Sequence, residues 1–180
     1  MKILIVYGTT EGQTRKIARF MEDVLQQAGH AVSIADAAVD PPSPQEFDAV
    51  IVGASIHIQK YQSAVEHFIR KNSEILNKKK SAFFSVCMAI ASGIEEEQQA
   101  ARKIADDFLM HTGWKPARHT TFAGALKYTQ YDFFKKLIMK MIAKKEGGST
   151  DTSHDHEYTN WEEVKKFVLD FASQEYSEKT

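Results

Sequence analysis

The stretch LIVYGTTEGQTRKIARFM, residues 4–21, joins an apolar run to a helical pattern through a short polar turn. The run KILIVY (2–7) is typical of a strand that is covered on both faces of its sheet. After the turn, apolar residues recur at helical spacing from Ile17 to Ala28, and Gly29 is a natural helix stop. The stretch therefore predicts a buried strand, a turn over 8–14 and a helix.

Composition limits the classes of protein to which the chain can belong. Its 180 residues are enough for one domain with a full core, so we predict a single domain over 1–180. The formal net charge of -1 provides no attraction to nucleic acid, which we do not expect as a partner. Cys87 is the one cysteine, so no internal disulfide can form. There is neither a signal-peptide pattern nor an apolar run of about 20 residues. We expect a cytoplasmic location, either free or peripheral on the inner face of the cell membrane.

Beyond the opening stretch, strand patterns alternate with helical ones. Strands are predicted over 2–7, 31–36, 47–56, 81–88 and 118–126. Helical patterns follow the first strand and also cover residues 62–76, about 92–111 and a last segment from about 159. The pairs Ser92 with Glu95 and Thr159 with Glu162 match capping boxes at the starts of the last two helices.

This alternation predicts an α/β fold, a doubly wound sheet of five parallel strands with helices on both faces, because parallel strands need crossover connections. Such sheets bind ligands beyond the carboxyl ends of their strands, where the strand order reverses. The loops 8–14, 53–61 and 86–93 therefore become the candidates for a binding site.

The turn GTTEGQT (8–14) contains no lysine. A P-loop would need a lysine where Gln13 stands, and a dinucleotide-binding turn would need three glycines at a different spacing. Backbone N–H groups and the hydroxyls of Thr9, Thr10 and Thr14 remain, at a helix N-terminus. That combination suits one phosphate dianion held without a cationic side chain. The alternative interpretation is a tight turn in which a threonine caps the helix.

The two later loops suit a flat aromatic ring. VGASIHIQKY (52–61) places Ile56, His57, Ile58 and Tyr61 where such a ring could lie, and the small residues of SVCMAIASG (85–93) allow close backbone approach. A phosphate turn with two ring-binding loops is the layout of a site for flavin mononucleotide (FMN). For His57 the alternative is a surface histidine.

Two other features are interpreted as structural. Cys87 is interpreted as a buried small residue, with a redox thiol as the alternative. His154, Asp155 and His156 are interpreted as a solvated loop, so no metal site is predicted.

With these motifs the sequence resembles the flavodoxins, and over nearly its whole length it resembles their menaquinone-dependent protoporphyrinogen IX oxidase (dehydrogenase) branch. The resemblance rests on EGQTRKIA (11–18), VGASIHIQKYQSAVEHF (52–68), SAFFSV (81–86) and FLMHTGWKP (108–116). It continues through the aromatic-rich run from Phe122 to EYTNWEEVKKF (157–167), which is the part most specific to the branch.

The resemblance implies FMN as cofactor, with its phosphate on the first turn and its isoalloxazine ring on the two later loops. The residues implied for the phosphate are Thr9, Thr10, Glu11, Gly12, Gln13 and Thr14. The residues implied for the ring are Ala54, Ser55, Ile56, His57, Ser85, Val86, Cys87, Met88 and Ala89. Two departures stand out. Glu11 replaces a threonine that is usual in flavodoxins, and CMAIASGIEEEQQ (87–99) is acidic where the branch is basic.

A long insertion, about 127–157, follows the fifth predicted strand. Within it, Phe134, Leu137, Ile138, Met141 and Ile142 share one helical face, and Lys136, Lys140 and Lys144 share another. One interpretation is peripheral membrane contact through 127–145. The alternative is a helix packed on the domain with solvated lysines.

The resemblance implies an enzyme that oxidises protoporphyrinogen IX to protoporphyrin IX with a membrane quinone as electron acceptor, in haem biosynthesis. Two alternatives remain from the residues themselves. One is a flavodoxin-like carrier that shuttles electrons between redox proteins, and the other is a domain that keeps the fold without a flavin. No catalytic acid or base is identified.

Overall fold

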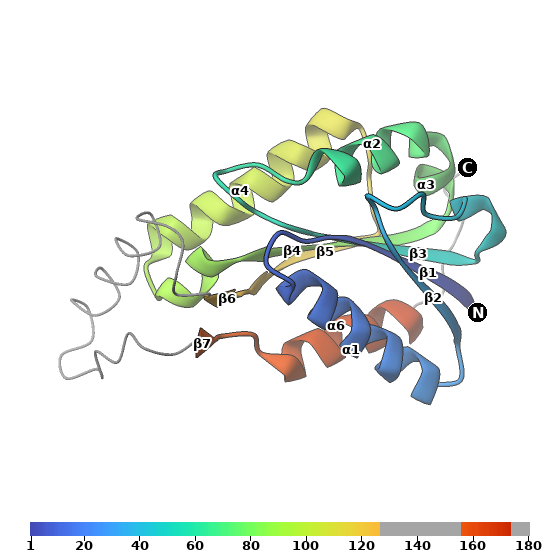
Figure 1. Ribbon diagram of the computed structural model, residues 1–180, viewed down its shortest axis with the longest axis horizontal. Helices are drawn as coiled ribbons and strands as arrows, with labels where there is room; N and C mark the ends of the chain where they lie inside the picture. The colour runs from blue at the N-terminus through green and yellow to red at the C-terminus, as the bar shows by residue number, and fades with distance from the viewer. Residues whose placement is uncertain (127–155, 174–180) are drawn as a thin grey trace.

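The computed structural model describes residues 1–126 and 156–173 (Figure 1). Its main sheet has five parallel strands in the order β2-β1-β3-β4-β5. The strands are β1 (Lys2–Gly8), β2 (Ala31–Asp36), β3 (Ala49–Ser55), β4 (Lys80–Cys87) and β5 (Arg118–Ala123). The doubly wound parallel sheet expected from the sequence is therefore confirmed. The single domain over 1–180 extends beyond the described residues and stays a prediction.

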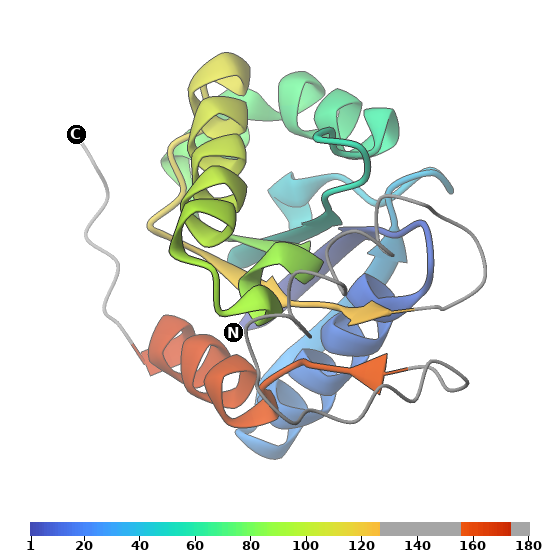
Figure 2. The same cartoon turned by 90° about the vertical axis from the view of Figure 1, so that its left-hand side faces the viewer.

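Helices cover both faces of this sheet. The α-helices are α1 (Gln13–Gln27), α2 (Ser63–Lys71), α3 (Ser73–Lys78), α4 (Glu95–Thr112) and α6 (Trp161–Ser173). Two short 3-10 helices are η1 (Pro44–Glu46) and η2 (Met88–Ser92). Helices α1 and α6 lie side by side on one face, and α2, α3 and α4 lie on the other (Figures 1 and 2). No helix in the described part of the chain combines the length and apolarity needed to cross a membrane.

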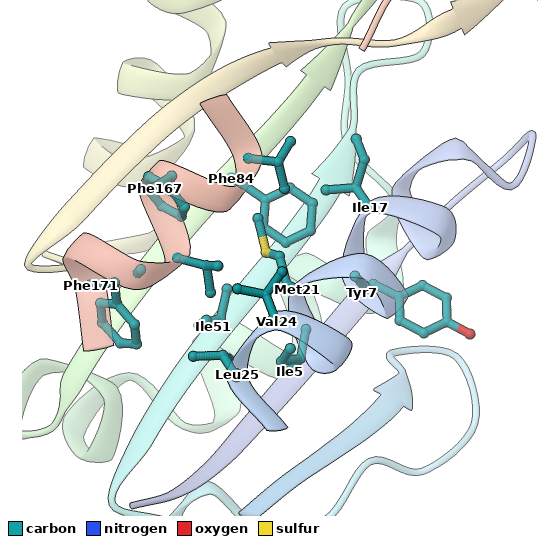
Figure 3. Close-up of a cluster of buried hydrophobic side chains, with 14 of the residues drawn as sticks. Ile5, Tyr7, Ile17, Met21, Val24, Leu25, Ile51, Phe84, Phe167 and Phe171 are labelled. Atoms are coloured by element: carbon teal, nitrogen blue, oxygen red, sulfur yellow. The ribbon is translucent and has the colours of Figure 1, made fainter. Parts of the chain in front are cut away.

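Each face of the sheet has its own apolar core. Ile3 and Ile5 point toward α1 and α6, whereas Leu4 and Val6 point toward the opposite helices, and all four are fully buried. This explains why β1 is a continuous apolar run, because a strand covered on both faces has no solvent side. Figure 3 shows the first core, in which Met21 and Phe84 pack between α1, α6 and the sheet.

The strand order reverses between β1 and β3, which are neighbours although β2 lies between them in sequence. From β1 the chain moves to one edge of the sheet, and from β3 it moves to the other. Loops that leave the carboxyl ends of these two strands therefore diverge and leave a crevice between them. The first two predicted binding loops begin at this point.

A short antiparallel ribbon lies beyond β5, where β6 (Ala125–Leu126) pairs with β7 (His156–Glu157). The sequence predicted one strand over 118–126, but Gly124 separates β5 from β6. The end of the predicted insertion thus contains β7. The predicted amphipathic helix and the histidine-containing loop before His156 lie outside the described residues.

Several predicted helix boundaries were wrong. The pattern over 62–76 forms two helices that divide at Asn72, whose side chain donates to the Phe68 carbonyl. The Ser92 hydroxyl accepts from the Ile94 N–H within the bend before α4, and α4 has no side-chain cap. At the start of α6 it is Asn160, not Thr159, whose side chain accepts from backbone N–H groups.

Candidate functional site

A cavity of about 560 Å³ opens at the carboxyl edge of the sheet, within the size range of small-molecule sites. The three predicted loops all contribute to its wall. Every predicted site residue lines it except Gly12, Ala54 and Ser85. The structure therefore brings together, around one space, three segments that are far apart in the sequence.

The β1–α1 turn forms one end of the cavity. Gly12 adopts a left-handed conformation (φ 94°) immediately before α1, and its N–H donates to the Thr9 hydroxyl over 2.9 Å. No side chain caps the N-terminus of α1. The first N–H groups of the helix are therefore left for another acceptor, with the positive end of the helix dipole behind them.

Thr14, in the first turn of α1, is fully buried, yet its Oγ1 has no hydrogen-bond partner among the described residues. A buried hydroxyl without a partner is unfavourable, and native proteins seldom retain one without a reason. The orphan hydroxyl and the uncapped N–H groups are close in the chain. Together they form a set of donors suited to an anion that binds from the cavity.

Gln62 links two sides of this cavity, a role that the sequence did not reveal. Its amide Nε2 donates to the Thr10 hydroxyl over 2.9 Å and to the Ser55 hydroxyl over 2.8 Å. Close approach is possible because Gly8 has no side chain: a Cβ there would lie 3.1 Å from Gln62 Oε1. Gln62 thus ties the turn after β1 to the end of β3.

The loop after β3 is held on both sides. The Ile56 N–H donates to the Val86 carbonyl over 2.9 Å, and the turn 57–60 is closed by two backbone hydrogen bonds between His57 and Lys60. Tyr61 does not line the cavity, contrary to its predicted exposure to a ring. Its hydroxyl bonds to Ser85 and its ring packs against Phe108. Burial raises the pKa of Tyr61 well above its ordinary value, so the phenol stays protonated.

The loop after β4 brings Val86, Cys87, Met88 and Ala89 to the cavity wall. Burial raises the pKa of the Cys87 thiol, with a smaller opposing effect from the Ala89 backbone. A raised pKa keeps the sulfur protonated at neutral pH, and the protonated form is a poor nucleophile. This favours the interpretation of Cys87 as a packing residue.

Helix α4 supplies a wall that was not predicted. Ala100, Ala101 and Ile104 line the cavity, as does the carboxylate-bearing Glu97. Gln59, Gly124 and Ala125 also line the cavity without having been named from the sequence, and Ile58, which was named as a residue near a ring, lines it as well. An amphipathic pattern shows that one face of a helix is buried but not which neighbour covers it, so only the small residues Ala100 and Ala101 could have suggested a close approach.

The charges around the cavity are acidic rather than basic. Glu11 and Glu97 line it, and among the described residues no lysine or arginine side chain does. Lys16, two residues after Thr14, instead pairs with Glu157 at the end of β7. Within the described residues, the groups that could hold an anion here are neutral donors and the helix dipole. Within the described ranges, no group of three or more His, Cys, Asp or Glu residues is placed to hold a metal ion.

The segment after β7 is fastened to the start of α1. Gln13 Nε2 donates to the Thr159 hydroxyl over 2.9 Å, and that hydroxyl donates to the Ala123 carbonyl over 2.8 Å. Glu157 accepts from Lys16 and, over 2.7 Å, from the Trp161 indole N–H. The Gln13 side chain is therefore used partly to hold the returning chain.

Comparison with known proteins gives matches over most of the chain. The model of the flavodoxin domain family matches residues 4–153. A curated protein of Escherichia coli K12 named protoporphyrinogen IX dehydrogenase [quinone] is 36% identical over 173 residues, which cover 96% of this chain and 95% of that protein. A Leishmania major protein of the same name is 30% identical over 177 residues, covering 96% and 75% respectively.

Solved structures agree on the fold. A flavodoxin of Streptococcus pneumoniae superposes with a TM-score of 0.56 at 14% identity, covering 96% of this chain and 99% of that one. Oxidised flavodoxin 1 of Bacillus cereus superposes with a TM-score of 0.52 at 16% identity, covering 81% and 100%. At such low identity these likenesses establish the architecture alone, and they confirm the flavodoxin-like fold expected from the sequence.

Proposed function

Because the chain belongs to the flavodoxin domain family, and within it to the protoporphyrinogen IX dehydrogenases [quinone], we propose that it oxidises protoporphyrinogen IX to protoporphyrin IX with a quinone as acceptor. The observation that carries the proposal is the 36% identity to the Escherichia coli enzyme over nearly the full length of both chains. The match covers 96% of this chain and 95% of that protein, so it spans the three loops that form the cavity wall.

The cofactor of this reaction is proposed to be FMN. Its phosphate requires donors for a dianion, and the Thr14 hydroxyl and the uncapped N–H groups of α1 fit that requirement. Its flat ring requires an apolar slot, and the side chains of Ile56, Met88, Ala100 and Ala101 in the cavity wall provide one. FMN, when bound, supplies the electron chemistry, and the protein supplies binding, orientation and electrostatics.

The residues around the cavity have definite tasks in this proposal. Thr14 would donate to a phosphate oxygen, and Gln62 holds the turn at a fixed distance from the end of β3. The apolar wall excludes water from the reacting ring. Each pair of electrons leaves the porphyrinogen with two protons and converts one quinone to a quinol, so the exchange balances. The phosphate and ring residues predicted from the sequence remain proposals for their individual roles.

The electron-carrier alternative is less well supported. The solved flavodoxins share the fold at under 25% identity, whereas the relatives that span the chain at 30% identity or more carry the dehydrogenase name. Contact with the inner face of the membrane through 127–145 would bring the enzyme to a membrane quinone. That segment lies outside the described residues, and the contact stays a prediction.

The proposal can be tested with the purified protein loaded with FMN. Protoporphyrinogen IX is added anaerobically with a menaquinone analogue, and porphyrin fluorescence is followed. We expect fluorescence to rise only when protein and quinone are both present. An FMN-loaded protein that gives no more porphyrin than the buffer would refute the enzyme proposal and favour the carrier. A protein that does not bind FMN would exclude both.

A further inference from the structure

The turn between His57 and Lys60 has a backbone that does not match its residues. Hydrogen bonds of 2.8 Å and 3.0 Å join His57 and Lys60 in both directions. Between them Ile58 and Gln59 have φ values of 47° and 61°. Two successive left-handed residues closed in this way have the geometry of a type I′ turn, which is normally built from asparagine and glycine.

Ile58 is an unfavourable residue for this position in two respects. A β-branched side chain at positive φ is a steric outlier, and strain of this kind persists mainly at functional sites. Its side chain is also 78% exposed, so burial does not offset the strain. Asparagine would suit both the backbone and the solvent. Within the described residues, the stability of the fold therefore does not account for Ile58, whereas a contact with a bound molecule would.

The position of Ile58 indicates what such a contact is. Although most of its surface faces solvent, Ile58 lines the cavity together with Ile56, Met88 and Ile104. It is thus an apolar residue at the mouth of a largely apolar cavity. A molecule that enters from outside meets Ile58 before it meets the inner wall.

We propose that Ile58 is the apolar contact that selects a lipid-soluble quinone ring as it enters the cavity; this rests on the function proposed above. A quinone ring is flat and uncharged, and it gains by covering an exposed isoleucine. The exposed apolar residue therefore favours the neutral acceptor.

The test is Ile58→Asn in the FMN-loaded protein. We expect the midpoint of thermal unfolding to stay the same or to rise, since asparagine tolerates the left-handed conformation. The KM for a menaquinone analogue should rise about tenfold, which corresponds to about 1.4 kcal/mol of lost apolar contact. This rise should be larger than any change in the Kd for FMN, in the KM for protoporphyrinogen IX or in turnover with the water-soluble acceptor ferricyanide.

Two further variants separate the side chain from other effects. Ile58→Leu keeps the apolar surface and should restore most of the quinone KM. Val39→Asn makes a similar change at another exposed apolar residue, 73% exposed and outside the cavity wall, and should leave the quinone KM at the wild-type value.

Several outcomes would overturn the contact. An unchanged quinone KM in Ile58→Asn would do so, and so would an equal loss in Ile58→Leu, which would assign the effect to the backbone. A Kd for FMN raised as much as the quinone KM would show that Ile58 contacts the cofactor. A KM for protoporphyrinogen IX raised as much would show that it contacts the substrate. Absence of quinone turnover in the wild-type protein would overturn the proposed function, and the contact with it.

Discussion

Thr14 is a polar side chain in a place where an apolar one would normally stand. It is fully buried and its hydroxyl has no partner among the described residues, so Thr14→Val should not destabilise the protein without FMN. The same change should weaken the binding of FMN by about 1.5–3 kcal/mol, the usual loss for a hydrogen bond to a charged group. Titration by flavin fluorescence measures the Kd, and thermal unfolding of the apoprotein measures stability.

Thr112→Val is the matched control for this experiment. Thr112 is also a buried threonine, but it lies at the far end of α4 and its hydroxyl donates to the Phe108 carbonyl. Here the stability should fall and the Kd for FMN should stay at the wild-type value. Equal affinity for FMN in Thr14→Val and wild type would show that Thr14 does not bind the phosphate.

At the residue scale, the sequence predicted the turn between β1 and α1 correctly because its geometry is local, whereas the phosphate on that turn stays a prediction. It failed at helix caps for the opposite reason. Ser92 and Thr159 both match a capping pattern, but the Thr159 hydroxyl bonds to Gln13 and Ala123, which are 146 and 36 residues away in the chain. In the folded molecule a hydroxyl can bond to groups that are distant in sequence, whereas a local pattern shows only the groups that are near in sequence. Gln62 was missed in the same way.

Among the elements, β3 depends on a residue with no side chain. A Cβ on Gly53 would lie 2.0 Å from Cζ of Phe84, whose ring is fully buried on the neighbouring strand β4. Because the surrounding core prevents the ring from moving aside, Gly53→Ala should destabilise the protein by about 1–3 kcal/mol or more. Urea denaturation should show a lower midpoint with an unchanged slope.

The double variant Gly53→Ala, Phe84→Leu tests the cause. Leucine vacates part of the space that the alanine methyl group needs, so the two changes should cost less together than the sum of their separate effects. Additive losses, or a Gly53→Ala variant as stable as the wild type, would contradict the steric explanation.

The elements themselves were largely predictable, because strand and helix periods are properties of the local sequence. Alternation of apolar strands with helical patterns was enough for the sheet, and α4 ends at Gly113, whose φ of 69° is easily adopted by glycine. The role of α4 in the cavity was not predictable. Whether Ala100 and Ala101 face the sheet or a ligand depends on how α4 packs against β5 and η2, and that is a tertiary property.

For the molecule as a whole, the predicted membrane contact concerns Lys136, Lys140 and Lys144, which lie outside the described residues. Basic side chains near an anionic membrane contribute about 1 kcal/mol each. Changing all three to glutamate should leave the Kd for FMN unchanged but lower binding to anionic vesicles, most strongly at low salt. Co-sedimentation with vesicles measures the effect. Equal binding of variant and wild type at low ionic strength would leave these lysines as a solvated helix face.

Glu157 joins β7 to α1 through Lys16, and this contact makes stability depend on pH. Burial raises the pKa of Glu157, but hydrogen bonds from Lys16 and Trp161 outweigh burial and bring it below its ordinary value of 4.5. A carboxylate with a depressed pKa in the folded state stabilises the fold fully above its unfolded-state pKa, and the contribution is lost as pH falls through the folded-state pKa.

The difference in unfolding free energy between wild type and Glu157→Gln should therefore be constant above pH about 5 and shrink below about 4.5. Urea denaturation across this range measures it, with Glu74→Gln on the exposed side of α3 as the control for the charge change. Because Lys16 is largely exposed, the difference should be modest and should decrease with added salt. A difference that persists unchanged into strong acid, or grows there, would show that the ion pair does not fasten the returning segment to α1.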